Sequence, residues 1–247
     1  MSGRSVLVTG GGKGVGKGIT ERFLEAGAEV VICGRSQPEQ LPVAAGREAR
    51  FIAADVKKAE EAESLVAAAA DSMGGLDVLV NNAGGSPFAE DSEASARFSE
   101  AILRLNLIAP LNLSRKANEL MQAQQEGGVI INIASVSGLR PSLGTAAYGA
   151  AKAGLLSLTQ TLAVEWAPKV RVNAVAAGMV RTEQAHLHYG DEERIAAISA
   201  TVPLRRLGRP RDVGDACLFL ASPLASYISG ASLLMHGGGE RPAFLDV

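Results

Sequence analysis

Short apolar runs alternate along the chain with longer stretches in which hydrophobic residues recur at helical spacing. The apolar runs, each a strand candidate, cover residues 5–9, 29–33, 50–54, 76–80, 129–133, 170–175 and 231–235. The helical stretches run from a glycine-rich turn to about residue 27 and then over residues 57–73, 93–121, 149–166 and 211–221, the third with an interruption near Pro110. This alternation predicts βαβ units and a parallel sheet. No internal repeat or low-complexity linker is present, so residues 1–247 are expected to form one domain.

The composition is that of a soluble globular protein with a sizeable core. Hydrophobic residues make up 47% of the 247 residues and charged residues 20%. The net charge of −2 and the lack of a basic cluster argue against nucleic acid as a partner. No uncharged apolar segment approaches the roughly 18 residues that would suggest a membrane span.

The two cysteines and the start of the chain bear on location. The sequence leads directly into the first strand candidate, which leaves no room for a signal peptide. Cys33 and Cys217 show no metal-type spacing and are expected to be reduced core residues. We therefore expect a cytoplasmic protein without a metal site.

A glycine-rich turn links the first strand candidate to the first helix. Residues 10–16 read Gly-Gly-Gly-Lys-Gly-Val-Gly, and glycines at such a turn let the backbone approach a phosphate at the helix N-terminus. Residues 11–17 satisfy most of a P-loop pattern, but Gly18 stands where that motif needs a Mg²⁺-binding Ser or Thr, which disfavours a nucleotide triphosphatase. The usual Gly-x-Gly-x-x-Gly spacing of dinucleotide folds is not met cleanly either. The pattern that fits is Thr-Gly-x-x-x-Gly-x-Gly over residues 9–16.

The end of the second strand candidate bears on which dinucleotide would bind. An NAD-type site places a carboxylate there to bind the ribose 2′-hydroxyl. Here the position holds Gly34, followed by Arg35, and an arginine fork binds a 2′-phosphate well. Lys13 in the glycine-rich turn offers a second cation. These residues favour NADP(H) as the cofactor, with NAD(H) as the alternative if Arg35 is only a solvated loop charge.

Residues 135–152 carry the candidate catalytic chemistry. Tyr148 and Lys152 are four residues apart, so a helix places both side chains on one face. A lysine ammonium beside a phenol lowers the phenol pKa, and such a tyrosine can exchange a proton near neutral pH. Ser135 follows the apolar run 129–133, at a strand end where catalytic hydroxyls are often presented. Taken alone, an ordinary Tyr/Lys pair on a helix explains the spacing equally well.

Other polar residues are ambiguous from spacing alone. Asn106 lies in an apolar part of the third helical stretch and needs hydrogen-bond partners there, so spacing favours a structural amide or one that stabilises a kink. His186 and His188 lie two apart with no supporting carboxylate or cysteine cluster. We interpret them as substrate-pocket candidates rather than metal ligands.

In this order and spacing, the motifs resemble those of the short-chain dehydrogenases/reductases over nearly the whole chain. The resemblance rests on Thr9-Gly10…Gly14-Val15-Gly16, Asp55-Val56, Asn81-Asn82-Ala83-Gly84, Asn106, Ser135 and Tyr148…Lys152. Its detail is similar to the branch that includes 3-oxoacyl-carrier-protein reductases and many alcohol and steroid dehydrogenases. It implies an α/β fold: a single Rossmann-like, doubly wound domain with a seven-stranded parallel sheet flanked by helices on both faces.

The resemblance also implies a role for each motif. Tyr148 would be the acid/base that protonates a carbonyl oxygen, and Ser135 would polarise that oxygen. Lys152 would lower the Tyr148 pKa and bind the nicotinamide ribose, and Asn106 would position a water linking Lys152 to bulk solvent. The residues implied in cofactor binding are Gly10, Gly11, Gly12, Lys13, Gly14, Val15, Gly16, Arg35, Asp55, Val56, Asn82, Ala83, Gly84, Tyr148, Lys152, Gly178, Val180 and Thr182.

The function that follows is hydride transfer between NADP(H) and a small-molecule carbonyl or secondary alcohol. One alternative is an NAD(H)-dependent alcohol dehydrogenase of the same family. Another is a non-catalytic dinucleotide sensor, although a sensor would be expected to have lost Ser135, Tyr148 or Lys152. Relatives commonly form tetramers through the helix at residues 149–166, so a homo-oligomer is expected.

Three departures from the family pattern concern the substrate lid and, at His236, a subunit contact that relatives commonly make. Ala177-Gly178 stands where Pro-Gly is usual, and His236 stands where an aspartate often precedes two glycines. The substrate lid, residues 181–203, begins with Arg181, which hints at a substrate with a carboxylate or phosphate. The lid and the loop at residues 85–92 should shape the pocket, but neither dictates one ketone over another.

Overall fold

The computed structural model describes residues 1–89 and 94–239, apart from the side chain of His188. Seven strands form one sheet in the order β5-β2-β1-β6-β7-β8-β9, with every neighbouring pair parallel. The strands are β1 Ser5–Thr9, β2 Glu29–Gly34, β5 Arg50–Ala53, β6 Val78–Asn81, β7 Gly128–Ser135, β8 Val170–Ala177 and β9 Ser232–Met235. The predicted seven-stranded parallel sheet is confirmed.

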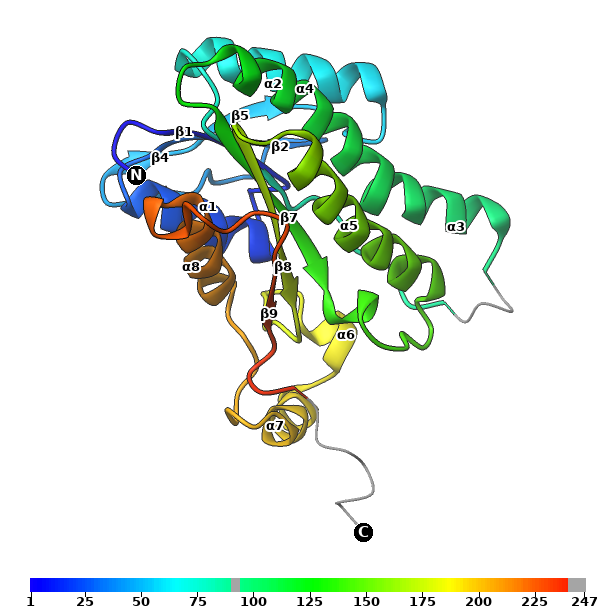
Figure 1. Cartoon of the computed structure of the whole chain (residues 1–247). Helices are drawn as coiled ribbons and strands as arrows, with labels where there is room; N and C mark the ends of the chain where they lie inside the picture. The colour runs from blue at the N-terminus through cyan, green and yellow to red at the C-terminus, as the bar shows by residue number, and fades with distance from the viewer. Residues whose placement is uncertain (90–93, 240–247) are drawn as a thin grey trace.

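Helices cover both faces of this sheet (Figure 1). On one face, α1 Gly14–Glu25 packs against α8 Pro210–Ala221. On the other, α2 Ala59–Met73 packs against α4 Ala109–Ala123, and α5 Ala146–Glu165 lies beside them. The fold is therefore the predicted doubly wound, Rossmann-like α/β arrangement.

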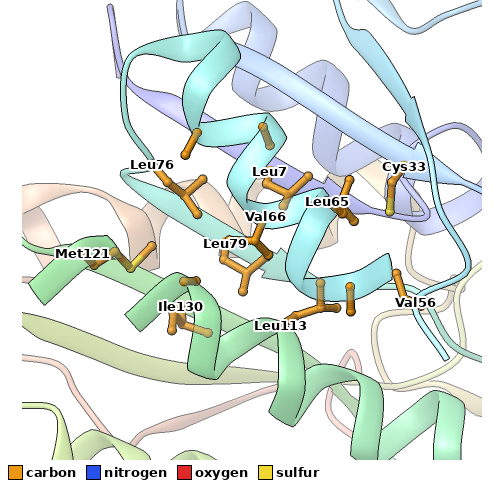
Figure 2. Close-up of a cluster of buried hydrophobic side chains, with 14 of the residues drawn as sticks. Leu7, Cys33, Val56, Leu65, Val66, Leu76, Leu79, Leu113, Met121 and Ile130 are labelled. Atoms are coloured by element: carbon orange, nitrogen blue, oxygen red, sulfur yellow. The ribbon is translucent and has the colours of Figure 1, made fainter. Parts of the chain in front are cut away.

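The central strands are apolar because helices bury them on both faces. Along β1, Leu7 belongs to the hydrophobic cluster on the α2 and α4 side, whereas Val6 and Val8 belong to the cluster on the α1 and α8 side. Figure 2 shows the first cluster, in which Leu65 of α2 and Leu113 of α4 lie over the sheet. The alternation along the strand thus divides one apolar run between two cores.

The order of the strands creates a crevice at the centre of the sheet. From β1 the chain adds β2 and β5 on one side, then crosses to β6 on the other side of β1 before adding β7, β8 and β9. The connections that follow β1 and β6 therefore diverge at the carboxyl ends of these strands. Open α/β sheets bind ligands at such a switch point. Here the glycine-rich turn follows β1, and residues 82–85 follow β6.

The helix predicted over residues 93–121 is irregular before Pro110 rather than at it. Its described part comprises α3 Ala96–Leu103, a π-helical turn η1 Arg104–Ile108 and α4, which follow one another directly. The irregular turn lies near Pro110, as predicted, and it has a physical reason. Proline has no N–H, so the carbonyl of Asn106 lacks the donor that a regular helix provides four residues later. The backbone widens over this turn instead, and Ala109 N–H donates to the carbonyl of Arg104.

The sequence pattern missed several short elements. Between β2 and β5 lies a small antiparallel hairpin of β3 Val43–Ala44 and β4 Arg47–Glu48. The segment predicted to form the lid, residues 181–203, contains two helices, α6 His186–Tyr189 and α7 Glu192–Thr201. Single 3₁₀ turns, η2 Val136–Gly138 and η3 Pro223–Ala225, complete the described elements. None of the helices within residues 1–89 and 94–239 is both long and apolar enough to cross a membrane.

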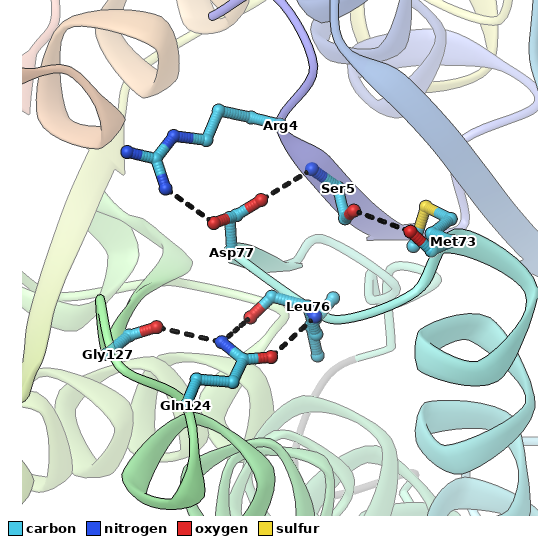
Figure 3. A network of polar contacts seen from close by, with 7 residues as sticks. All are labelled: Arg4, Ser5, Met73, Leu76, Asp77, Gln124 and Gly127. Carbon is cyan, nitrogen blue, oxygen red and sulfur yellow. Dashed lines mark hydrogen bonds and ion pairs between the residues drawn. The ribbon is translucent and has the colours of Figure 1, made fainter.

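Hydrogen bonds join the amino ends of the strands at the edge of the sheet opposite the crevice (Figure 3). Asp77, just before β6, accepts a bond from the Arg4 guanidinium at 2.6 Å and one from the Ser5 N–H at 2.7 Å. Gln124, just after α4, makes three further bonds in the same region. These contacts hold β1 and β6 in register and thereby keep their carboxyl ends aligned at the crevice.

Gln124→Ala is expected to destabilise the fold without affecting the crevice. The side chain accepts the N–H of Leu76 at 2.8 Å and donates to the carbonyls of Leu76 and Gly127 at 3.0 and 2.9 Å. Truncation leaves these partly buried backbone groups unpaired, so the free energy of unfolding should fall by about 1–3 kcal/mol. Urea denaturation measures the change. The neighbouring exposed Gln125→Ala is the control, and equal losses in the two variants would contradict the assignment.

Candidate functional site

A cleft of about 770 Å³ opens at the carboxyl ends of the central strands. The glycine-rich turn, the loop after β2, residues 82–85, the start of α5 and the beginning of the lid form its walls. Of the residues predicted from the sequence, those that line it are Gly10, Gly12, Lys13, Gly14, Val15, Gly16, Arg35, Asp55, Val56, Asn82, Ala83, Gly84, Ser135, Tyr148, Lys152, Gly178, Val180 and Thr182. The structure thus brings almost the whole predicted site into one cavity.

The glycine-rich turn is fastened to β6 by hydrogen bonds. The Thr9 hydroxyl accepts the N–H groups of Asn82 and Ala83 at 3.0 and 2.9 Å, and the Asn82 amide donates to the carbonyls of Thr9 and Gly10 at 2.9 and 3.3 Å. A Cβ on Gly16 would lie 2.2 Å from the Gly10 carbonyl oxygen, so only glycine fits. This packing aims the N-terminus of α1 into the cleft. A helix N-terminus in this position suits the pyrophosphate of a dinucleotide.

The wall beyond β2 carries positive charge. Gly34 ends the strand, and the exposed Arg35 follows it on the cleft wall. Lys13, the N-cap residue of α1, is also exposed on this cleft. No carboxylate is present over residues 34–38, where an NAD-type site would hold its ribose. This wall therefore offers two cations, and its residues 34–38 offer no carboxylate.

Three predicted catalytic side chains converge at the other end of the cleft. Ser135 ends β7, and its hydroxyl accepts the N–H of Ser137 at 3.1 Å. Tyr148 and Lys152 lie one turn apart on α5, as predicted, with the Lys152 Nζ 5.4 Å from the centre of the Tyr148 ring. The ammonium donates to the Ile133 carbonyl at 2.8 Å, which ties α5 to β7 beside the serine.

Burial controls the acidity of both residues on α5. Desolvation raises the pKa of the Tyr148 phenol, while a hydrogen bond with Ser135 works in the opposite direction. The lowering of this pKa that the sequence predicted is therefore wrong for the structure as it stands. Burial also lowers the pKa of the Lys152 ammonium to about 8. The lysine, not the tyrosine, is the group that titrates nearest neutral pH.

The π-helical turn contacts the site through the side chain of Asn106, which lies beside Gly84. Asn106 is fully buried, and its amide donates to the carbonyls of Gly85 and Ile102 at 3.0 and 2.9 Å and accepts the Gly85 N–H at 2.9 Å. A Cβ on Gly84 would lie 2.7 Å from Asn106 Oδ1 and 3.4 Å from Lys152 Nζ. Glycine at this position therefore leaves the space between the two polar side chains open.

Two predicted residues do not line the cleft. Asn106 lies behind the wall, where its amide binds the backbone of Gly85 and Ile102, and the relay role that the resemblance implies for it stays a prediction. Gly11 is buried, and a Cβ there would lie 2.4 Å from Ile32 Cγ2 and 2.8 Å from Thr20 Oγ1. The structure therefore gives Gly11 a packing role between β2 and α1 rather than a position on the cleft.

Sequence reasoning overlooked several residues of this site. Thr9 was noted only as part of a motif, yet its hydroxyl joins the turn to β6. Glu183 and Tyr189 of the lid also line the cleft. Glu183 could have been found because it directly follows Thr182, which the resemblance assigned to the cofactor site. Tyr189 could have been singled out because aromatic residues are scarce in this chain.

The predicted cation of the lid is already paired. The Arg181 guanidinium donates to both carboxylate oxygens of Glu192 at 2.8 Å. Both bonds come from one guanidinium nitrogen, and a substrate role for Arg181 stays a prediction. His186 lies in α6, whereas the side chain of His188 lies outside the described part of the structure.

Two alternatives raised by the sequence were a P-loop and a metal site. A Cβ on Gly18 would lie 2.4 Å from the Pro210 Cβ, so the Ser or Thr of a P-loop does not fit there. Within residues 1–89 and 94–239, no group of three or more His, Cys, Asp or Glu side chains is placed to hold a metal ion.

Comparisons with known proteins agree with this geometry. Residues 10–240 match the family described as enoyl-(acyl carrier protein) reductase. An uncharacterized oxidoreductase of Mycobacterium tuberculosis is 37% identical over 248 residues, which is 98% of this chain and 94% of that protein. A 3-oxoacyl-acyl-carrier-protein reductase of Vibrio cholerae is 37% identical over 244 residues, which is 96% and 98% of the two chains.

Solved structures show the same fold. An aldohexose dehydrogenase from Thermoplasma acidophilum superimposes with a TM-score of 0.88 at 29% identity, covering 95% of this chain and 93% of that one. A putative short-chain alcohol dehydrogenase from Sinorhizobium meliloti gives a TM-score of 0.88 at 35% identity, covering 96% of both chains. The chain belongs to the short-chain dehydrogenase/reductase family and is an oxidoreductase of its 3-oxoacyl-carrier-protein reductase-like branch.

Proposed function

We propose that the protein transfers a hydride between NADP(H) and a small-molecule carbonyl or secondary alcohol. The observation that carries the proposal is the convergence of Ser135, Tyr148 and Lys152 in the same cleft as the glycine-rich turn. The relatives are named as dehydrogenases and reductases of different substrates, among them a glucose dehydrogenase and a 3beta-hydroxysteroid dehydrogenase. The names agree on oxidoreduction and leave the substrate open.

The side chains divide the proton chemistry between them. When bound, the nicotinamide supplies or accepts the hydride, and the protein provides orientation and a proton. Tyr148 gives its phenolic proton to the carbonyl oxygen during reduction, and the Ser135 hydroxyl polarises that oxygen. Burial raises the pKa of the Tyr148 phenol, so the step depends on stabilisation of the phenolate by its neighbours.

Lys152 serves this step as a charge and as a proton carrier. The buried ammonium stabilises the phenolate that forms when Tyr148 gives up its proton. With a pKa of about 8, it exchanges protons near neutral pH. The open space beside Gly84 separates it from Asn106, and a water there would complete a relay to solvent.

The cofactor preference rests on Arg35. Arg35→Ala is expected to raise the KM for NADPH about tenfold, since a charge-assisted hydrogen bond to the 2′-phosphate is lost. The KM for NADH should stay nearly the same, because that cofactor has no 2′-phosphate. Steady-state kinetics with both cofactors measures the two values. Arg47→Ala, which removes an exposed cation on β4, is the control.

The opposite result would favour the NAD(H)-dependent alternative. A wild-type protein that prefers NADH, or an Arg35→Ala variant with an unchanged KM for NADPH, would contradict the assignment of the 2′-phosphate site. Neither result would bear on the roles proposed for the catalytic residues, because Arg35 and the catalytic side chains lie on different parts of the cleft wall.

Assembly and location complete the proposal. Ala150 and Ala153 are exposed on α5, and Val164 of the same helix is 81% exposed. An apolar helix face of this kind suits a second copy of the chain, so we include a homo-oligomer in the proposal. Light scattering measures its mass. A cytoplasmic location stays a prediction.

A further inference from the structure

One residue of the lid reaches across to the glycine-rich turn. A carboxylate oxygen of Glu183 accepts the backbone N–H of Gly14 at 2.8 Å, although the two residues lie 169 positions apart. The preceding Thr182 lies beside Gly14 as well: its Cγ2 is 3.6 Å from the point where a Cβ of Gly14 would lie. The lid is therefore attached to the first residue of α1.

This contact supplies a cap that α1 does not have from its own sequence. The N-cap side chain, Lys13, makes no capping hydrogen bond, and the first turn of α1 contains no acidic residue. A carboxylate at a helix N-terminus is stabilised by the backbone N–H groups and the helix dipole. Glu183 therefore fills a position that favours an anion.

The proposed cofactor needs the same position. Its pyrophosphate is negatively charged and would be held by the N–H groups at the start of α1. We propose that Glu183 is a latch, which holds the lid on the glycine-rich turn and competes with the dinucleotide pyrophosphate for the N-terminus of α1. This inference rests on the proposed function and adds a residue that sets the affinity for the cofactor and couples its binding to the lid.

The base of the lid is attached independently of this latch. Arg181 N–H donates to the Gly208 carbonyl at 2.8 Å, and Gly208 N–H donates to the Met179 carbonyl at 2.9 Å. The rest of the lid has its own core, in which Ala185, Ile195, Val202 and Leu207 are buried together. Displacing the Glu183 carboxylate thus releases only the short segment around Thr182 and Glu183 from the glycine-rich turn, while residues 179–181 and the lid helices keep their packing.

Removing the carboxylate should strengthen binding of the dinucleotide. Glu183→Ala is expected to lower the Kd for NADPH about two- to tenfold, the range given by an anion at a helix N-terminus. Glu183→Gln, which keeps an acceptor without the charge, should give a smaller decrease. Fluorescence titration at fixed ionic strength measures the Kd. The control is Glu193→Ala, which makes the same charge change on the first turn of α7.

Hydrogen exchange tests the latch without any dinucleotide. Peptides from the glycine-rich turn and from residues 181–189 should exchange faster in Glu183→Ala than in the wild-type protein or in Glu193→Ala. Unchanged exchange would overturn the latch, as would a Kd for NADPH that is unchanged, raised or shifted equally by Glu193→Ala. A wild-type protein that binds neither NADPH nor NADH would instead refute the proposed function, while the exchange result would still decide whether the latch exists.

Discussion

Tyr148→Phe should lower turnover about 10²–10⁴-fold, the contribution expected of a general acid placed on the reacting oxygen. The phenol lies in the cleft, hydrogen-bonded with Ser135, and the substitution removes only its hydroxyl. The Kd for NADPH should be nearly unchanged, because the ring and its packing remain. Steady-state kinetics and fluorescence titration on the same preparation separate the two effects.

A matched aromatic change outside the lid and the cleft serves as the control. Tyr227→Phe removes a phenol hydroxyl from a fully exposed residue between η3 and β9 and should change neither quantity. Turnover that survives Tyr148→Phe would show that another group supplies the proton. A lost affinity for NADPH would show instead that the phenol serves binding.

Lys152→Met should lower turnover about a hundredfold or more, as expected when a fixed charge beside the reacting groups is lost. Methionine fills the space of the aliphatic stem but cannot donate to the Ile133 carbonyl, which the ammonium reaches at 2.8 Å. Binding of NADPH should weaken as well if the ammonium holds the nicotinamide ribose. Kinetics at saturating cofactor distinguish the loss in turnover from the loss in affinity.

The same variant should alter how stability depends on pH. Burial lowers the folded-state pKa of Lys152 to about 8 from an ordinary value of 10.5. Between these values the unfolded chain binds more protons than the folded chain, so the free energy of unfolding rises with pH. The lysine should contribute about 1 kcal/mol between pH 8 and pH 9, and Lys152→Met should lack this contribution.

The pH window is limited by two buried thiols, Cys33 and Cys217, whose pKa values burial raises. Burial raises the pKa of Cys33 to about 11 from 9.0, so above pH 9 its ionisation in the unfolded chain works against the effect of Lys152. Urea denaturation of both proteins at pH 8 and pH 9 measures the difference. Equal changes in the wild-type protein and the variant would contradict a lowered pKa for Lys152.

Much of the fold followed from local patterns. Strands such as β1 are short, apolar and bounded by glycine, so their positions were predictable from the sequence to within a few residues. The site followed because the carboxyl ends of parallel strands meet at one edge, which brings the Thr9-Gly10 turn, Asn82 and Ser135 together. A periodicity argument was sufficient to place Tyr148 and Lys152 on one face of α5.

What the sequence missed depends on contacts between distant segments. The π-helical turn at Asn106 results from a proline one turn later, and its hydrogen bonds reach Gly85 across the fold. The pKa of Tyr148 depends on burial, which spacing does not reveal. The bond between Glu183 and Gly14 joins residues 169 positions apart, and no local pattern predicts it.

The central claim, hydride transfer between NADP(H) and a carbonyl, has one direct test. Wild-type protein is incubated with NADPH carrying deuterium at the transferable position of the nicotinamide and with a panel of 3-oxoacyl thioesters, cyclic ketones, steroid ketones and small aldehydes. Mass spectrometry of the products should show deuterium on the carbon that bears the new hydroxyl, and Tyr148→Phe should give almost none. Tight binding of NADPH with no deuterium transferred to any member of the panel would contradict the claim and favour a dinucleotide sensor.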